Sequence, residues 1–210
     1  MLARSITVRG IVQGVGFRPF IYRLAVQYGL KGWVNNSNEA VHIHIEGSDH
    51  EINQFLQAIQ LQAPPAAHII SMEVEETEPI SLHEFEILDS SNVSEAVTRV
   101  SPDIAVCEEC LHDMLTQPHR RHYPLINCCH CGPRFSIIEQ LPYDRPNTTM
   151  RVFEMCDKCR QEYTDPSDRR FHAQPVACNN CGPRYTLYYE QEDIVLKIDR
   201  IDDILAWMAK

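Results

Sequence analysis

Residues 10–19 read Gly-Ile-Val-Gln-Gly-Val-Gly-Phe-Arg-Pro, and this stretch decides how the first part of the chain folds. Ahead of it, Ile6 and Val8 alternate with polar residues, which predicts a half-buried strand. At its end, Pro19 suits the first turn of a helix whose apolar residues recur at helical spacing up to Tyr28. A glycine-rich turn between a strand and a helix lets backbone N–H groups and the helix N-terminus converge on an anion.

The next seventy residues alternate between strand and helix patterns. Apolar residues separated by single polar residues predict strands, and a run at helical spacing follows a capping box that begins at Ser48. The predicted elements are strands at Trp33–Val34, Val41–Ile45, Ile70–Val74 and Phe85–Ile87, and a second helix at Ile52–Ile59. The order βαββαβ predicts a ferredoxin-like α+β domain over residues 1–90, followed by a polar linker from Asp89 to Glu95.

Arg18 is the candidate ligand-binding side chain of the glycine-rich turn. It opens the predicted helix, where its forked guanidinium suits a phosphate. A dinucleotide fingerprint is disfavoured, because the third glycine after Gly14-Val-Gly16 would fall at Pro19 and the parallel βαβ context is missing. A tight turn with a solvated Arg18 is the remaining alternative.

Two motifs in this part resemble the acylphosphatase family. They are Gly10-x-Val-Gln-Gly-Val-Gly-Phe-Arg18 and Gly32-Trp-Val-Asn-Asn36-Ser, and the likeness spans residues 4–88. The resemblance implies that the loop binds the phosphate of an acyl phosphate and that Arg18 and Asn36 are catalytic, the asparagine orienting the attacking water. The phosphate-binding residues that it implies are Gln13, Gly14, Val15, Gly16, Phe17 and Arg18.

One position departs from the pattern of that family. Ala40 stands where a glycine is usual in the turn after Asn36. If the turn requires a positive φ, alanine costs about 1 kcal/mol there, or the turn changes type. Asn35 lies one position off the motif and would point to the opposite face of the strand.

All nine cysteines lie in the second half of the chain, and eight of them form four C-x2-C pairs. Gaps of 17 and 18 residues separate the pairs of each half, and the halves start 49 positions apart, which indicates an internal duplication. The pairs are Cys107/Cys110, Cys128/Cys131, Cys156/Cys159 and Cys178/Cys181. No secretory signal and no bilayer-spanning stretch is evident, so a cytoplasmic protein without disulfides is expected.

The spacing is typical of two tetrahedral four-cysteine zinc sites, at 107–131 and 156–181, within a second domain over residues 91–185. We expect both zinc ions to be structural, so their removal should unfold this domain. Ligand pairing within each repeat or interleaved between repeats stays open. Cys129 is a spare thiol or a ligand in place of Cys128, and redox or nucleophilic cysteines are disfavoured by the regular pairing.

The stretch from Asp165 to Arg184, with Phe-His-Ala-Gln-Pro-Val-Ala-Cys178-x-x-Cys-Gly-Pro-Arg, resembles the paired zinc fingers of the hydrogenase-maturation carbamoyltransferases, the HypF family. Their first module is acylphosphatase-like. The resemblance implies that carbamoyl phosphate and ATP yield a carbamoyl adenylate. The carbamoyl group then passes to the C-terminal cysteine of a partner protein, on the way to the cyanide ligands of nickel–iron hydrogenases.

The same resemblance implies that ATP binding and transfer are performed by two further large domains. Residues 186–210, with a strand at Leu187–Tyr189 and a helix from Ile201 to Met208, would be the truncated start of the next one. The chain is therefore expected to be the N-terminal portion of such an enzyme. It would bind and hydrolyse carbamoyl phosphate, without catalysing carbamoyl transfer alone.

A binding module is the alternative from another functional class. In that case the zinc repeats dock a protein or nucleic acid, with Arg120-Arg121 and Arg169-Arg170 as a patch, and the first domain is a catalytically silent anion site. The net charge is −10, from 19 basic and 29 acidic residues, and residues 100–185 carry ten basic against eleven acidic ones. This balance disfavours nucleic acid as a partner, and protein docking is the preferred form of the alternative.

Overall fold

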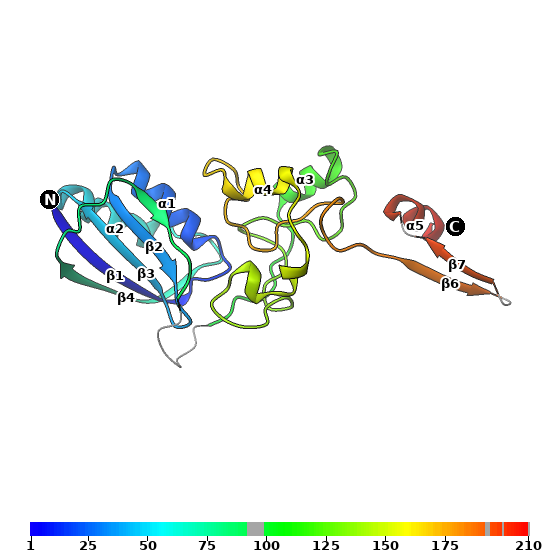
Figure 1. The fold of residues 1–210 in the computed structure, drawn as a ribbon, viewed down its shortest axis with the longest axis horizontal. Helices are drawn as coiled ribbons and strands as arrows, with labels where there is room; N and C mark the ends of the chain where they lie inside the picture. The colour runs from blue at the N-terminus through cyan, green and yellow to red at the C-terminus, as the bar shows by residue number, and fades with distance from the viewer. Residues whose placement is uncertain (92–98, 192–193, 199, 210) are drawn as a thin grey trace.

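The computed structural model describes residues 1–91, 99–191, 194–198 and 200–209. Figure 1 shows a sheet with two helices at the N-terminal side, a loop-rich middle, and a hairpin with one helix at the C-terminal side. No helix in these described ranges is both long and apolar enough to cross a membrane.

The first part is the predicted α+β domain. Its strands form one sheet in the order β4-β1-β3-β2-β5, antiparallel except for the parallel pair β2–β5. The elements are β1 (Leu2–Ile11), α1 (Phe17–Gln27), β2 (Lys31–Asn36), β3 (Val41–Gly47), α2 (Asp49–Leu61), β4 (His68–Thr77) and β5 (Phe85–Ile87). The ferredoxin-like order βαββαβ is thereby confirmed, with the short fifth strand added beside β2.

Strand alternation places one apolar face of the sheet against α1 and α2 (Figure 1). Ile6 on β1 lies opposite Ile43 on β3, and both side chains are fully buried with Phe55 of α2. The capping box of α2 is present, since Ser48 accepts from the N–H of Glu51 and Glu51 accepts from the N–H of Ser48. This packing fixes the ends of β1 and β2, which carry the glycine loop and Asn36.

The segment after β5 continues beside β2. The N–H of Leu88 donates to the carbonyl of Val34 at 2.9 Å, and the N–H of Ser91 donates to the carbonyl of Asn36 at 2.9 Å. The predicted linker therefore begins as a paired segment, and its residues 92–95 lie outside the described part of the chain. The domain boundary near residue 90 stays a prediction.

The cysteine-rich middle is built from loops and short helices. Its elements are α3 (Glu108–Thr116), the 3-10 helices η1 (Arg145–Asn147) and η2 (Thr149–Val152), and α4 (Asp157–Thr164). Cys107 and Cys156 stand at the N-termini of α3 and α4, so the duplicated sequence builds a duplicated structure. Its buried apolar clusters are small, and half of their buried residues are cysteines.

The last part contains β6 (Leu187–Gln191), β7 (Ile194–Ile198) and α5 (Ile201–Met208), with β6 and β7 paired as an antiparallel hairpin. The predicted strand and helix are present, and β7 was not predicted. Assignment of these residues to the start of another domain stays a prediction.

Gly10 is required at the register shift of β1 against β4. Its φ is +138°, and a Cβ atom there would lie 2.0 Å from the carbonyl oxygen of His68 on β4. We expect Gly10→Ala to lower the free energy of unfolding by about 3 kcal/mol, because strain and a backbone clash add. Gly29→Ala is the control: its φ is +66° with nothing within 4 Å, so about 1 kcal/mol is expected. Urea titration followed by tryptophan fluorescence measures both, and equal losses would contradict the clash.

Candidate functional site

The glycine-rich loop turns β1 into α1 and places Arg18 at the start of the helix. Gly14 and Gly16 adopt φ angles of +73° and +77°, the left-handed region that favours glycine. Arg18 lies in the first turn of α1 and is 8% exposed, and Asn36 at the end of β2 is 1% exposed. Both residues line one cavity of about 30 Å³ together with the loop, so the structure brings the two sequence-predicted catalytic candidates together.

The other predicted phosphate-binding residues divide into two groups. Gln13, Gly14, Gly16 and Phe17 line the cavity. The Val15 side chain instead lies fully buried in the apolar core. The Gln13 amide is held by the protein: its Nε2 donates to the carbonyl of Ser37 at 2.6 Å.

Asn36 points a free acceptor into this region. Its side-chain Oδ1 is buried and has no hydrogen-bond partner among the described residues. Asn35 takes the other direction: its Nδ2 donates to Ser91 Oγ at 3.4 Å, and its Oδ1 is likewise buried without a partner among the described residues. A buried carbonyl oxygen without a donor is costly unless a ligand or water supplies one, so Asn36 is suited to hold a water molecule.

Ala40 does not strain the turn after Asn36. Among the described residues, the non-glycine positions with positive φ are Ser81, His122 and His172, so alanine needs no left-handed conformation at position 40. Ser37 closes the turn instead: its N–H donates to the Ala40 carbonyl at 2.8 Å, and its hydroxyl accepts from the Ala40 N–H at 3.1 Å. The turn therefore forms without the glycine that is usual there.

The cysteine-rich part covers the glycine loop, which sequence reasoning missed. Arg134, 1% exposed, donates through Nε to the carbonyl of Gly14. Its guanidinium also donates to the carbonyls of Cys128 and Cys129, at 2.9 and 3.0 Å. Because one buried guanidinium binds both parts of the chain, the loop and the first repeat are held together. The repeated Cys-Gly-Pro-Arg motif marked Arg134, but not the surface to which it would bind.

The segment between the two repeats contacts the predicted catalytic arginine. Arg18 Nη2 donates to Asp144 Oδ1 at 2.6 Å and to the carbonyl of Tyr143 at 3.3 Å. The N–H of Tyr143 donates to Gln13 Oε1 at 3.0 Å. A second, larger hollow of about 480 Å³ is lined by Arg18 and Asp144, together with Ser90 and Asn147.

His172 lies in both hollows, close to Arg18 and Asp144. Its ring packs edge-on against Phe171, at a centroid distance of 4.7 Å. Burial lowers the pKa of this imidazole to about 4, and the positive charge of Arg18 acts in the same direction, against a smaller opposing effect of Asp144. His172 is therefore neutral at pH 7.

We expect NMR titration of His172 to give a pKa near 4, and Arg18→Met to raise that value. Because the folded-state pKa lies below the ordinary 6.5, the unfolded chain binds more protons between these values. The neutral imidazole therefore favours the folded state above pH 6.5, and this contribution is lost as pH falls from 6.5 through 4. A pKa near 6.5 in the wild-type chain would contradict the burial of this ring.

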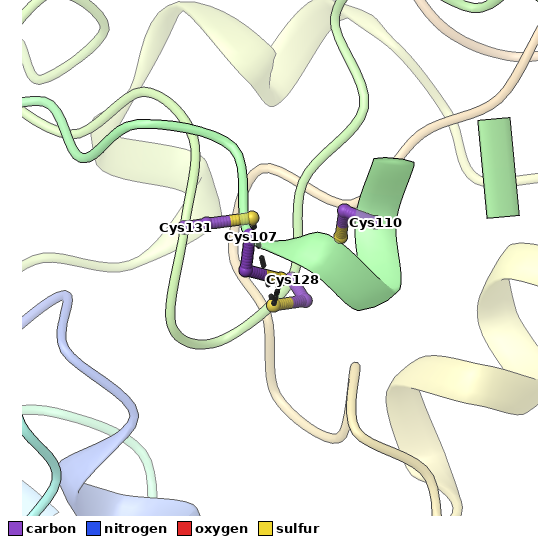
Figure 2. Close-up of side chains that lie close together, drawn as sticks. All are labelled: Cys107, Cys110, Cys128 and Cys131. Carbon is purple, nitrogen blue, oxygen red and sulfur yellow. Dashed lines mark hydrogen bonds between the residues drawn. The ribbon is translucent and has the colours of Figure 1, made fainter. Parts of the chain in front are cut away.

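The cysteine pairs form two separate four-sulfur clusters. In each cluster the four Sγ atoms lie within 4.8 Å of one another. Figure 2 shows the first, with Cys107 and Cys110 at the start of α3 and Cys128 and Cys131 on a facing loop. The second contains Cys156, Cys159, Cys178 and Cys181. The four cysteines of each cluster thus come from one repeat, so the pairing is local and not interleaved between the repeats.

The sulfur positions fit tetrahedral zinc. Tetrahedral zinc–sulfur bonds of ~2.3 Å place neighbouring sulfurs about 3.8 Å apart. The sulfur pairs Cys107–Cys128 and Cys128–Cys131 are 3.8 and 3.7 Å apart, and Cys156–Cys178 and Cys178–Cys181 are 3.7 and 3.8 Å apart. The predicted cofactor, two structural zinc ions, fits these residues.

Cys129 stands apart from both clusters. Its Sγ donates to the carbonyl of Phe171 at 2.9 Å, and burial raises the pKa of the thiol to about 12. It lines the small cavity opposite Gly16, where a Cβ atom on the glycine would approach the Cys129 Cβ to 3.2 Å. The ninth cysteine is a protonated packing residue between the two parts of the chain.

Each repeat supplies an arginine to the zinc ligands of the other. Arg120 of the first repeat donates to Cys159 Sγ at 3.4 Å and pairs with Glu162 on α4. Arg170 of the second repeat donates to Cys110 Sγ at 3.8 Å and pairs with Asp113 on α3, at 2.6 Å. Arg120 and Arg170 both stand eight residues before the third cysteine of their repeat. The two contacts are therefore related by the duplication.

The docking patch predicted from the paired arginines is wrong for these two residues. Arg120 is 0% exposed and Arg170 is 1% exposed, because they cross between the repeats. Arg169 also turns inward, donating to Cys110 Sγ at 3.1 Å and pairing with Asp113. Arg121 is the exposed member of the four. The binding-module alternative loses the surface on which it rested.

We expect Arg120→Met to weaken zinc at the second cluster about tenfold to a hundredfold, since it removes a donor to Cys159 that orients the ligand. A second substitution in the same chain, Glu162→Gln, removes the carboxylate that Arg120→Met would leave without its partner. Zinc release to a competing chelator measures the change, and Arg121→Met is the exposed control. Weakening of the first cluster alone, or of neither, would contradict the cross-repeat contact.

Comparison with known proteins agrees with this architecture. Residues 4–87 match the acylphosphatase family, and residues 106–138 and 155–188 match the HypF finger family. A carbamoyltransferase HypF from Rhodobacter capsulatus is 50% identical over 187 residues, covering 89% of this chain and 25% of that protein. An acylphosphatase from Thermotoga petrophila is 44% identical over 88 residues, covering 41% of this chain and 97% of that protein.

A solved structure supports the same relationship. The crystal structure of full-length HypF in its phosphate- and nucleotide-bound form superposes with a TM-score of 0.86 at 46% identity, covering 91% of this chain and 26% of that one. The fold and the sites define an acylphosphatase-type domain joined to a pair of four-cysteine zinc fingers. The chain belongs to the HypF carbamoyltransferase family. It spans about a quarter of the length of the HypF relatives that it matches.

Proposed function

We propose that this chain binds and hydrolyses carbamoyl phosphate, as the acylphosphatase-type portion of a cytoplasmic carbamoyltransferase. The observation that carries the proposal is the placing of Arg18 and the unpartnered Asn36 oxygen on one cavity, beside the glycine loop. A guanidinium at a helix N-terminus suits a phosphate dianion, and the asparagine oxygen suits the hydrogen of a water molecule.

The chemistry needs no covalent intermediate on the protein. An acyl phosphate is a mixed anhydride with a good leaving group, so binding of the phosphoryl charge and orientation of one water supply the acceleration. The oxygen of the attacking water would form a bond to phosphorus while the bond from phosphorus to the bridging oxygen breaks, and carbamate and inorganic phosphate are released with a proton. Arg18 would bind the phosphoryl oxygens, and Asn36 would accept a hydrogen bond from the attacking water.

In this proposal the zinc ions have a structural role. With four thiolates each, both sites are closed and leave no position for a substrate. They hold the loops that carry Arg134 and Asp144 against the glycine loop and Arg18. The fingers therefore act on the acyl-phosphate site through its walls.

Within the complete enzyme, we place this portion before the ATP-dependent steps. The carbamoyl group would be activated as an adenylate and transferred to a cysteine of a partner protein by domains beyond those described here, in the maturation of nickel–iron hydrogenases. The support is the relationship to proteins named carbamoyltransferase HypF. Transfer is not expected from residues 1–210 alone.

We expect Arg18→Met to abolish phosphate release from carbamoyl phosphate, a loss of at least about a hundredfold, because it removes the charge that binds the phosphoryl group. Phosphate release by the purified, zinc-loaded chain measures this. Arg4→Met is the control, since Arg4 lies on β1 and pairs with Glu76 away from the cavity. Equal turnover by wild type and Arg18→Met would refute the role of Arg18.

A further inference from the structure

The partner of Arg18 is a carboxylate from a distant part of the chain. Asp144 lies in the segment between the two zinc fingers, and its Oδ1 is 2.6 Å from Arg18 Nη2. The arginine side chain is 9% exposed and the aspartate side chain 21% exposed, so the pair is shielded from water on most sides. A shielded, charge-assisted pair is stronger than one on the surface.

Asp144 uses the donor that a phosphate would use. Arg18 Nη2 also donates to the Tyr143 carbonyl at 3.3 Å, and Nη1 donates to Ser90 Oγ at 3.3 Å. Both terminal nitrogens are therefore engaged by groups of the same chain. A phosphate that binds through Nη2 has to displace the carboxylate, and every anion that uses this nitrogen meets that same competition.

Displacement leaves two acceptors beside the bound phosphate, the Asp144 carboxylate and the Tyr143 carbonyl. Neighbouring His172 is neutral, because its pKa is lowered to about 4. The cation facing this carboxylate is thus Arg18 itself. A freed carboxylate in this place needs a hydrogen-bond donor, and leaving it without one is unfavourable.

Acyl phosphates differ in whether they supply that donor. Carbamoyl phosphate carries an amino group next to the anhydride, whereas acetyl phosphate carries a methyl group in the same place. Sites that hydrogen-bond a polar group of the substrate reject the analogue without it far more strongly than apolar pockets reject a small difference in size. The contacts of residues 143–144 therefore bear on the identity of the acyl group.

We propose that Asp144 is a specificity-determining residue for the carbamoyl group, a proposal that rests on the acyl-phosphate hydrolysis proposed above. Its carboxylate holds Arg18 until a phosphate takes that place, and it then accepts a hydrogen bond from the carbamoyl amino group. Acetyl phosphate can supply only the first half of this exchange, because its methyl group has no hydrogen to donate. The aspartate thus weakens the binding of all anions and favours the one substrate that replaces the lost contact.

Two variants of the full chain distinguish the competition for Arg18 from the recognition of the carbamoyl amino group. Asp144→Ala removes both charge and acceptor, and Asp144→Asn removes the charge and keeps an acceptor oxygen of the same shape. Glu139→Gln is the matched control, because Glu139 lies in the same inter-finger segment and pairs with Arg151 outside both hollows. Zinc content and thermal unfolding verify that each variant keeps the fingers folded.

The readouts are the dissociation constant for inorganic phosphate and the ratio of kcat/KM for carbamoyl phosphate to that for acetyl phosphate. We expect both Asp144 variants to bind phosphate about tenfold more tightly, because each loses the shielded carboxylate that competes with phosphate for Arg18. The carbamoyl-to-acetyl ratio should fall about tenfold in Asp144→Ala, less in Asp144→Asn, and stay unchanged in Glu139→Gln.

Unchanged or weaker phosphate binding in both variants, or an unchanged substrate ratio in Asp144→Ala, would overturn the proposal. Its failure is distinct from that of the proposed function. If the wild-type chain hydrolyses neither acyl phosphate, the proposed function fails, and the phosphate affinities still decide whether Asp144 competes for Arg18. If the wild-type chain hydrolyses both and the variants keep the ratio, only the role of Asp144 is lost.

Discussion

The two four-sulfur clusters are the constraint on which the second half of the structure depends. Residues 105–185 have few helices and only small apolar clusters, in which half of the buried residues are cysteines, so metal–thiolate bonds take the place of a conventional core. The loops that they fix carry Arg134, Tyr143 and Asp144 to the glycine loop and Arg18 of the first domain. The surroundings of Arg18 are therefore set by two four-cysteine sites at a distance in the sequence.

The arginine exchange makes the two clusters one unit. Arg120 and Arg170 are buried guanidiniums, and a charge in such a place persists only when it is paired and hydrogen-bonded. Each finds its partners, a carboxylate and a thiolate, on the opposite repeat. Arg120 also donates to Gln117 of its own repeat, at 3.0 Å, but the close carboxylate and thiolate partners of both arginines lie on the opposite repeat, so each repeat stabilises the other. A duplication that began as two fingers has thereby become a single module.

The sequence predicted those features that depend on local pattern. Alternation gave the strands, and helical spacing gave α1 and α2, because the 1–90 region buries one face of each element. The cysteine spacing gave the zinc ligands, although only the structure shows them grouped within each repeat. The pairing of Arg18 with Asp144 joins residues 126 positions apart, and no periodicity encodes such a contact. The basic pairs misled for a related reason, since an arginine that crosses between repeats has the same local sequence as an exposed one.

The cysteine-rich part covers the glycine loop and so gives Arg18 other surroundings than an open site would. In an open site Arg18 would face water, which screens its charge and competes for its donors. Here the fingers exclude most of that water and supply a carboxylate in its place. A low-dielectric site strengthens every contact that a well-matched substrate makes, and it penalises every acceptor that a poorly matched one leaves unpaired. Under the proposal made above for Asp144, the wall that opposes anion entry would also sharpen the choice among anions, so residues 143–144 would act on both affinity and selectivity.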